Sequence, residues 1–149
     1  MSAPAPPEPP DCDVSKLPGF MVDTNRLLGS ELWAISSGDE FKAAVTLWCR
    51  AWHQVPAASL PDVDRLLSSF AGYGRDIKSW LKVRPMALRG FVLCADGRLY
   101  HPVLAADAVR AVVKVRECRE RTRAATEARQ SKRYGERDVE VREWIDQRL

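Results

Sequence analysis

Between Phe91 and Pro102 the chain has the pattern of a β-hairpin, within a sequence whose other periodicity is helical. Two short runs of apolar and aromatic residues flank Asp96-Gly97. An Asp-Gly pair supplies the positive φ angles that a tight hairpin turn needs. We therefore expect Phe91–Cys94 to pair with Leu99–Pro102, and any fold proposed for the chain must combine helices with this one hairpin.

The composition predicts one core with loose ends. The chain has 149 residues, of which 46% are apolar, enough for a single domain. Half of its ten prolines lie in the first ten residues, so residues 1–16 are expected to form a disordered or polyproline arm that buries nothing. No apolar run approaches the roughly 20 residues that span a bilayer, and no signal-peptide pattern is present. We expect no membrane contact and a cytoplasmic location in a host cell.

Three helices are predicted before the hairpin, and the first two precede residue 75. Ser37-Gly38-Asp39-Glu40 has the form of a capping box, and Phe41, Val45, Trp48 and Trp52 follow at helical spacing. This stripe is typical of a core helix that ends at His53. Before it, Leu32, Trp33 and Ile35 are expected to cover one end of the core. A second helix is expected to open with Ser59 as N-cap and Pro61 in its first turn, and to end at Gly72. Its inner side would be formed by Val63, Leu66, Leu67 and Phe70.

A third helix, starting near Arg75, has a basic side and an apolar side. Arg75, Lys78, Lys82 and Arg89 fall within about 60° of one another on a helical wheel. Arg84 points toward the apolar side, and Pro85 predicts a kink or break near it. Two interpretations are open: the basic side enters a DNA groove, or it is an ordinary solvated surface.

Basic charge is concentrated from this third helix onward. Residues 1–74 hold five basic and nine acidic side chains, whereas residues 110–133 hold nine and three. The stretch from Val103 to about Arg133 has no proline or glycine and predicts one long helix that projects from the domain. Its arginines, together with Arg98 of the hairpin, could lie along phosphates. The arginines we single out are Arg116, Arg119 and Arg123. The alternative is a charged extension without a partner.

The last residues predict a separate short helix. Gly135 interrupts the pattern, and Val141, Trp144, Ile145 and Leu149 then form an amphipathic stripe. Such a stripe suits docking into the groove of a partner protein. Packing onto this chain's own surface and pairing with a second copy, as a homodimer, are the alternatives.

Several blocks of the sequence closely resemble the YdaU-like family, a domain of unknown function (number 1376) found in phage and prophage proteins. The blocks are Ser37–Val45, Leu47–Cys49, Trp52–Pro56, Ser59–Asp62, Ala87–Gly90 and Asp96–Val103. They occur in the same order as in the family and cover about residues 23–105. The resemblance implies a domain like the N-terminal part of phage replication proteins, where similar domains are winged helices. Pro85 departs from the family pattern, which puts the continuity of the third helix in doubt.

The sequence therefore predicts a mainly α fold with a small β-hairpin. Residues 1–16 would be the arm, 17–115 a winged-helix-like domain, 116–133 a basic projecting helix and 134–149 the short amphipathic helix. The expected function is double-stranded DNA binding in phage DNA replication or its control, by origin binding or helicase loading. The alternative is an adaptor or inhibitor that binds a host or phage factor, such as the replicative helicase, through its C-terminal helix.

An enzyme is the poorest interpretation. Asp62, Asp64 and Asp107 are scattered, and their spacing does not favour metal chemistry over helix capping. The four cysteines form no C-x-x-C pair, and His53 and His101 lack neighbours at metal-ligand spacing. No phosphate-binding loop or hydrolase motif occurs. We expect neither catalysis, nor a metal, nor a cofactor.

Overall fold

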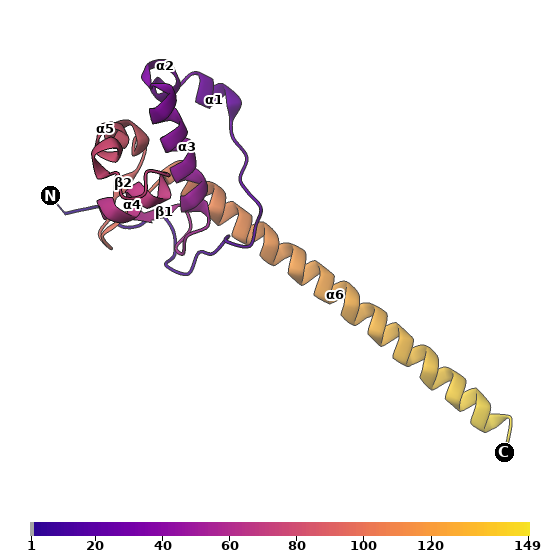
Figure 1. Cartoon of the computed structure of the whole chain (residues 1–149). Coiled ribbons are helices and arrows are strands. Elements are labelled where there is room, and N and C mark those ends of the chain that lie inside the picture. The colour runs from indigo at the N-terminus through magenta and orange to yellow at the C-terminus, as the bar shows by residue number, and fades with distance from the viewer. Residues whose placement is uncertain (1) are drawn as a thin grey trace. The chain divides into compact units, whose positions relative to one another are not determined.

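The computed structural model describes residues 2–149 and is mainly helical, with a small antiparallel sheet and a long C-terminal helix (Figure 1). The fold class predicted from the sequence is confirmed at this level. The chain divides into two compact units, one ending at Val112 and one spanning Val113–Leu149. The elements are α1 (Thr24–Leu28), α2 (Glu31–Ile35), α3 (Gly38–Trp52), β1 (Ser59–Pro61), α4 (Asp64–Phe70), α5 (Ile77–Ala87), β2 (Val92–Leu93), β3 (Arg98–Tyr100) and α6 (Pro102–Asp146).

The predicted hairpin is confirmed, although its strands are shorter than expected. Val92 pairs with Tyr100 and Leu93 with Leu99 in an antiparallel register. The turn differs from the expected one, because only Gly97 has a positive φ, of 78°. The Gly97 N–H donates to the Cys94 carbonyl at 3.0 Å and the Cys94 N–H to the Arg98 carbonyl at 2.9 Å. A three-residue loop with glycine in the left-handed position therefore replaces a two-residue turn.

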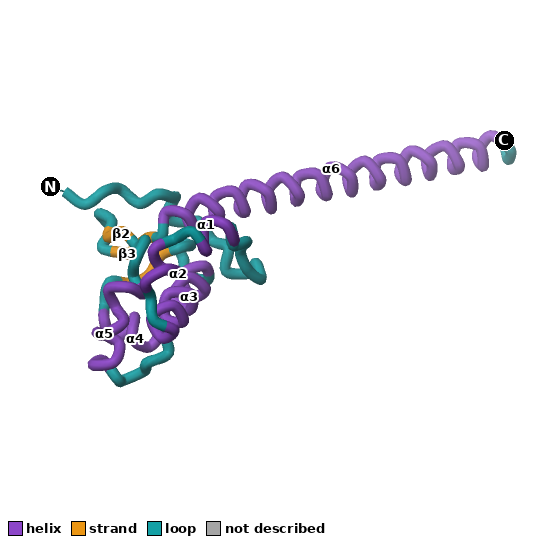
Figure 2. Tube along the Cα trace, turned by 90° about the horizontal axis from the view of Figure 1, so that it is seen from above, coloured by secondary structure: helices purple, strands orange, loops and turns teal. Residues whose placement is uncertain are grey.

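A third strand, β1, lies where the sequence predicts the start of a helix. Ser59 pairs with Tyr100 and Pro61 with Arg98, so the sheet order is β1-β3-β2. Figure 2 shows β2 and β3 of this sheet next to each other. Pro61 is tolerated because β1 is an edge strand and the missing N–H costs no ladder bond on its open side. The assignment of Ser59 as an N-cap is wrong. Helix α4 begins at Asp64, with Val63 at its N-cap position and no side-chain cap.

Helix α3 forms as predicted, including both hydrogen bonds of the capping box between Ser37 and Glu40. The most deeply buried side of the helix is formed by Leu47 and small residues, and Trp52 is buried near its end. Phe41, Val45 and Trp48 are only half-buried. Trp33 and Ile35, expected to cover the core, are exposed, and of that short helix only Leu32 is buried.

Two expected helix breaks are absent. Helix α5 runs through Pro85 to Ala87. Pro85 lies in the last turn, where its missing N–H removes one bond, and the burial of Val83 and Ala87 holds the turn in place. Helix α6 likewise runs through Gly135 to Asp146, so residues 134–149 do not form a separate helix. A single glycine costs a helix about 1 kcal/mol relative to alanine and need not end it. No helix within residues 2–149 has the length and apolar character needed to cross a bilayer.

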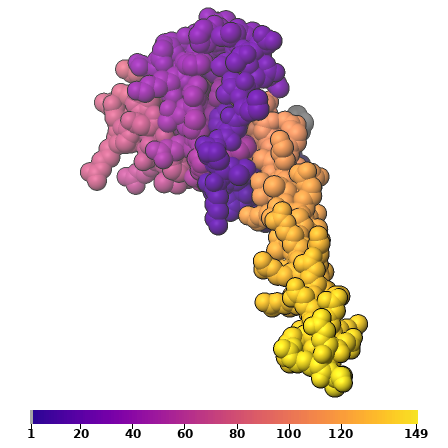
Figure 3. Space-filling view, turned by 90° about the vertical axis from the view of Figure 1, so that its right-hand side faces the viewer, coloured from indigo at the N-terminus to yellow at the C-terminus, as the bar shows by residue number. Residues whose placement is uncertain are grey.

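The N-terminal segment is packed onto the first unit, so the expectation that it buries nothing is wrong. The Ala95 N–H of the hairpin loop donates to the Pro4 carbonyl at 2.8 Å, and the Ala57 N–H donates to the Cys12 carbonyl at 2.9 Å. Cys12 and Val14 are buried beside Trp52 and Ala108, the latter near the start of α6. Figure 3 shows the N-terminal part of the chain (indigo) beside the start of α6 (orange). The polyproline composition carries no information about where this segment docks.

Glu8 is the one carboxylate buried by this packing within the described residues. Its side chain is 6% exposed, and neither carboxylate oxygen has a hydrogen-bond partner. Loss of solvation raises the pKa of Glu8 to about 7, and the neighbouring Cys12 thiol offsets part of that rise. The pKa of the Cys12 thiol is raised to about 12. Burial is the larger cause of this rise, and the negative charge of Glu8 is the next. The arm thus docks most favourably with Glu8 protonated.

Two adjacent leucines of α4 test the core assignment. Leu67 is fully buried, whereas Leu66 is 46% exposed. Leu67→Ala should lower the free energy of unfolding by about 3 to 4 kcal/mol, because it leaves a cavity in the core. Leu66→Ala should cost less than about 1 kcal/mol. Urea denaturation measures both, and equal losses would contradict the placement of α4.

Docking of the arm should make stability depend on pH. The folded protein holds a proton on Glu8 that the unfolded chain releases above pH 4.5, so this group lowers the free energy of unfolding as pH rises from about 4.5 to 7. Glu8→Gln removes this penalty, and its advantage over wild type should grow by up to about 3 kcal/mol across that range.

The difference between the two proteins isolates Glu8 from His101, which acts in the opposite direction. Burial, helped by the charge of Arg26, lowers the pKa of His101 from its ordinary value of 6.5 to about 4. The contribution of His101 to the free energy of unfolding therefore rises as the pH increases from about 4 to 6.5. Urea unfolding of wild type and Glu8→Gln from pH 4.5 to 8 measures the difference. Parallel stability curves would show that Glu8 is solvated.

Candidate nucleic-acid interface

The inner side of α5 is fixed by a buried tryptophan and a half-buried ion pair. Trp80 is fully buried, and its indole N–H donates to Asp64 Oδ1 of α4 at 3.0 Å. Arg84, one turn later, donates from Nε to the same oxygen at 2.8 Å. The bond from Trp80, followed by the contact with Arg84, lowers the pKa of Asp64. Asp64 and Arg84 therefore join α4 to α5. Arg84 points toward the apolar side of α5, as its place on the helical wheel predicts.

The outer side of α5 carries lysines without acidic partners. Lys78 and Lys82 lie one turn apart and are exposed, and Arg75 is exposed just before the helix. None of the ion pairs among residues 2–149 includes these three side chains. Leu81, expected on the apolar side, is 49% exposed next to Lys82. This outer side therefore presents exposed cations and one exposed apolar side chain.

The two other arginines predicted near this side are engaged elsewhere. Arg89 forms an ion pair with Glu31 of α2. Arg98 of the hairpin is half-buried, where its Nε donates to Ser59 Oγ at 2.9 Å. The hairpin loop itself carries Asp96, which accepts a bond of 2.7 Å from the Tyr100 hydroxyl. The structure thus brings Lys78 and Lys82 together but does not add Arg89 or Arg98 to them as free cations.

The second unit carries the remaining predicted residues on α6. Arg116, Arg119 and Arg123 are exposed and lie within about 60° on the helical wheel. Farther along, Val141, Trp144 and Ile145 lie within about 100° of one another, on the same side of the helical wheel as these arginines, and are 56%, 55% and 42% exposed. The Arg148 guanidinium lies over the Trp144 ring, 3.9 Å from its centre. Leu149 follows the helix end and is fully exposed.

Comparisons of the chain with protein-family models, with curated proteins and with solved structures gave no match. The resemblance to the YdaU-like family stays a prediction.

Proposed function

We propose that the first unit is a winged-helix domain that binds double-stranded DNA through α5. The order α3-β1-α4-α5-β2-β3 and the sheet order β1-β3-β2 support this proposal, because winged helices combine a helix-turn-helix with a terminal hairpin in this way. In this arrangement α4 is the supporting helix and α5 the helix that enters the groove. The turn between them contains Gly72 and Gly74, both with positive φ.

The observation that carries the proposal is the pair of unpartnered lysines, Lys78 and Lys82, on the outward side of a rigidly held helix. Lysines that neutralise phosphates release condensed counterions, which drives binding without reading sequence. Leu81, about 60° from Lys78 on the helical wheel, suits contact with an apolar group such as a thymine methyl. The hairpin contributes less, because Arg98 is held by Ser59 and the loop presents Asp96.

Arg116, Arg119 and Arg123 are proposed as a second, sequence-independent phosphate contact. They point to one side of α6 and have no ion-pair partner in the described chain. Together with the resemblance to a phage and prophage family, these contacts support a role in phage DNA replication or its control. Origin binding and helicase loading are the two forms of that role we propose.

Replacing both α5 lysines should weaken DNA binding in a salt-dependent way. For Lys78→Ala/Lys82→Ala, the slope of log affinity against log salt should fall by about two units, since each phosphate contact contributes about one. Fluorescence anisotropy on a duplex over a salt titration measures it. The matched control is Lys16→Ala/Lys42→Ala, which removes the same charge from exposed sites outside α5.

Equal slopes for the two double variants would exclude α5 as the contact. If binding is lost only when Arg116, Arg119 and Arg123 are changed to Ala, the contact lies on α6 and the winged-helix mode of binding is wrong.

A second function is favoured by the exposed apolar side of α6. We propose that Val141, Trp144 and Ile145 bind a protein, because a tryptophan flanked by aliphatic side chains is typical of interface anchors. The partner would be a replication protein such as the replicative helicase, or a second copy of this chain.

Two valines test this surface. Val139 is exposed as much as Val141 but lies about 160° away on the helix. Val141→Asp should abolish self-association or capture of the helicase, because it places a charge in the apolar contact. Val139→Asp should leave both intact. Sedimentation and a pull-down with purified helicase are the measurements, and indistinguishable behaviour of the two variants would exclude this surface.

A further inference from the structure

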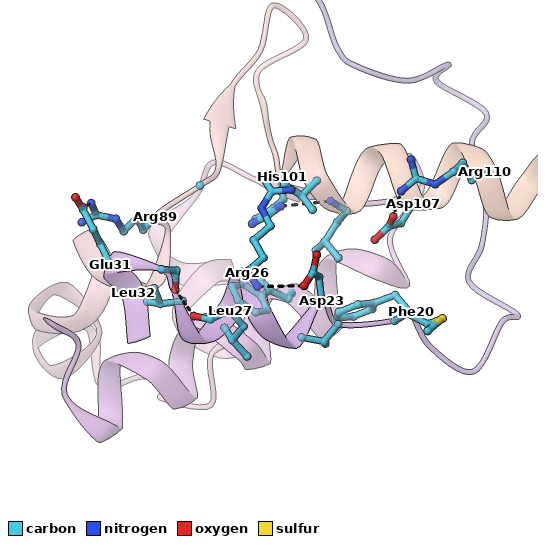
Figure 4. A pocket seen from close by; sticks show the side chains of 17 residues that line it. Phe20, Asp23, Arg26, Leu27, Glu31, Leu32, Arg89, His101, Asp107 and Arg110 are labelled. Carbon is cyan, nitrogen blue, oxygen red and sulfur yellow. Dashed lines mark hydrogen bonds and ion pairs between the residues drawn. The ribbon is translucent and has the colours of Figure 1, made fainter. Parts of the chain in front are cut away.

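A cavity of about 550 Å³ lies in the first unit, between the α1–α2 segment and the first turns of α6 (Figure 4). Most of its wall is apolar, formed by Phe20, Leu27, Leu32, Trp48, Val103 and Leu104. Its volume and apolar wall are typical of sites that bind small organic molecules. Neither Lys78 nor Lys82 lines it, so the cavity is separate from the DNA contact proposed above.

Four of the six charged groups around the cavity form two ion pairs. Glu31 is bound by Arg89, and Asp107 is bound by Arg110. The third carboxylate, Asp23, caps α1 by accepting the backbone N–H of Arg26 at 3.0 Å. The guanidinium of Arg26 takes part in none of the ion pairs found in residues 2–149. Among residues 2–149, Arg26 and Asp23 are therefore the charged groups of the cavity wall that form no ion pair, and one oxygen of Asp23 is already occupied by the helix cap.

His101 supplies a second donor beside that cation. Its Nδ1 accepts the Leu104 N–H at 3.4 Å, which places the proton of the neutral ring on Nε2. Nε2 has no hydrogen-bond partner in the described part of the chain and lies at the cavity wall near Gly90. Figure 4 shows the Arg26 side chain extending toward His101, in agreement with its effect on the His101 pKa. Two donors therefore lie at the cavity wall, and neither has an acceptor among the hydrogen bonds and ion pairs of residues 2–149.

We propose that this cavity binds a small organic carboxylate with an aliphatic or aromatic body. The Arg26 guanidinium and the His101 Nε2–H hold the carboxylate, since a guanidinium matches the two oxygens of that group. The positive N-terminal end of α6, at Pro102–Leu104, adds to the preference for an anion. Phe20, Leu27 and Leu32 contact the body of the ligand. Inorganic phosphate would leave this apolar wall unused.

Sodium octanoate is the probe, with octylammonium chloride and 1-octanol as matched ligands that share its chain but not its charge. Amide chemical shifts of the full-length protein, followed by NMR, report where and how tightly each ligand binds. Octanoate should shift the Gly90 and Leu104 amides and bind at least about tenfold more tightly than octylammonium or octanol. Arg26→Gln should remove that advantage. Arg50→Gln, an exposed arginine outside the cavity, should keep it.

Three results would overturn the proposal. If octanoate and octanol bind equally to the wild-type protein, the cavity has no carboxylate subsite. If Arg26→Gln and Arg50→Gln weaken octanoate equally, the effect is one of net charge. If octanoate causes no shift at Gly90 or Leu104, the ligand does not enter the cavity. Because none of these readouts involves DNA, failure here leaves the DNA-binding proposal standing.

Discussion

The packing of α3 against α5 determines where the proposed DNA contact lies. Leu47 and Ala51 of α3 meet Trp80 and Val83 of α5 in one buried cluster. A residue two positions before or after another on a helix lies about 160° from it. Once Trp80 occupies the core, Lys78 and Lys82 must therefore both face away from it. The burial of one tryptophan thus fixes the orientation of two cations.

Asp64 connects this contact to the neighbouring helix. One of its carboxylate oxygens accepts bonds from both Trp80 and Arg84, which lie one turn apart on α5. The arrangement satisfies the buried indole N–H and holds α4 and α5 in a fixed relation. Because Arg84 is paired with Asp64, it is not a free cation for binding phosphate. Arg84 interrupts the apolar side of α5 in the sequence. It is tolerated there because Asp64 of α4 accepts its hydrogen bond.

Features set by neighbouring residues could be predicted from the sequence, and features set by distant ones could not. The capping box at Ser37, the hairpin at Gly97 and the start of α6 depend on local chemistry, and all three form. Strand β1 exists because Leu60 pairs with Leu99, far along the chain, whereas its local pattern favours a helix start.

The same distinction between local and distant contacts applies to the residues of the candidate site. Spacing along one helix predicts that Lys78 and Lys82 share a side, as the structure shows. Nothing in the spacing of Arg89 or Arg98 indicates Glu31 or Ser59 as partners, because these come from other elements. The cavity was missed for the same reason: Arg26 and His101 are 75 residues apart in the sequence. An unpaired arginine near a short helix is too common a pattern to single out.

The two functions proposed for α6 use parts of the helix that differ in charge. Residues 113–133 carry eight basic and three acidic side chains, whereas residues 134–149 carry three and five. Arg123 and Val141 are separated by about 27 Å along a helix rising 1.5 Å per residue. Since exposed charges are screened beyond about 8 to 10 Å at physiological salt, the acidic end does not cancel the attraction of the basic part for phosphates. In the proposed complex, Arg116–Arg123 contact the DNA backbone, and the separation along the helix leaves Trp144 and its neighbours available to a protein.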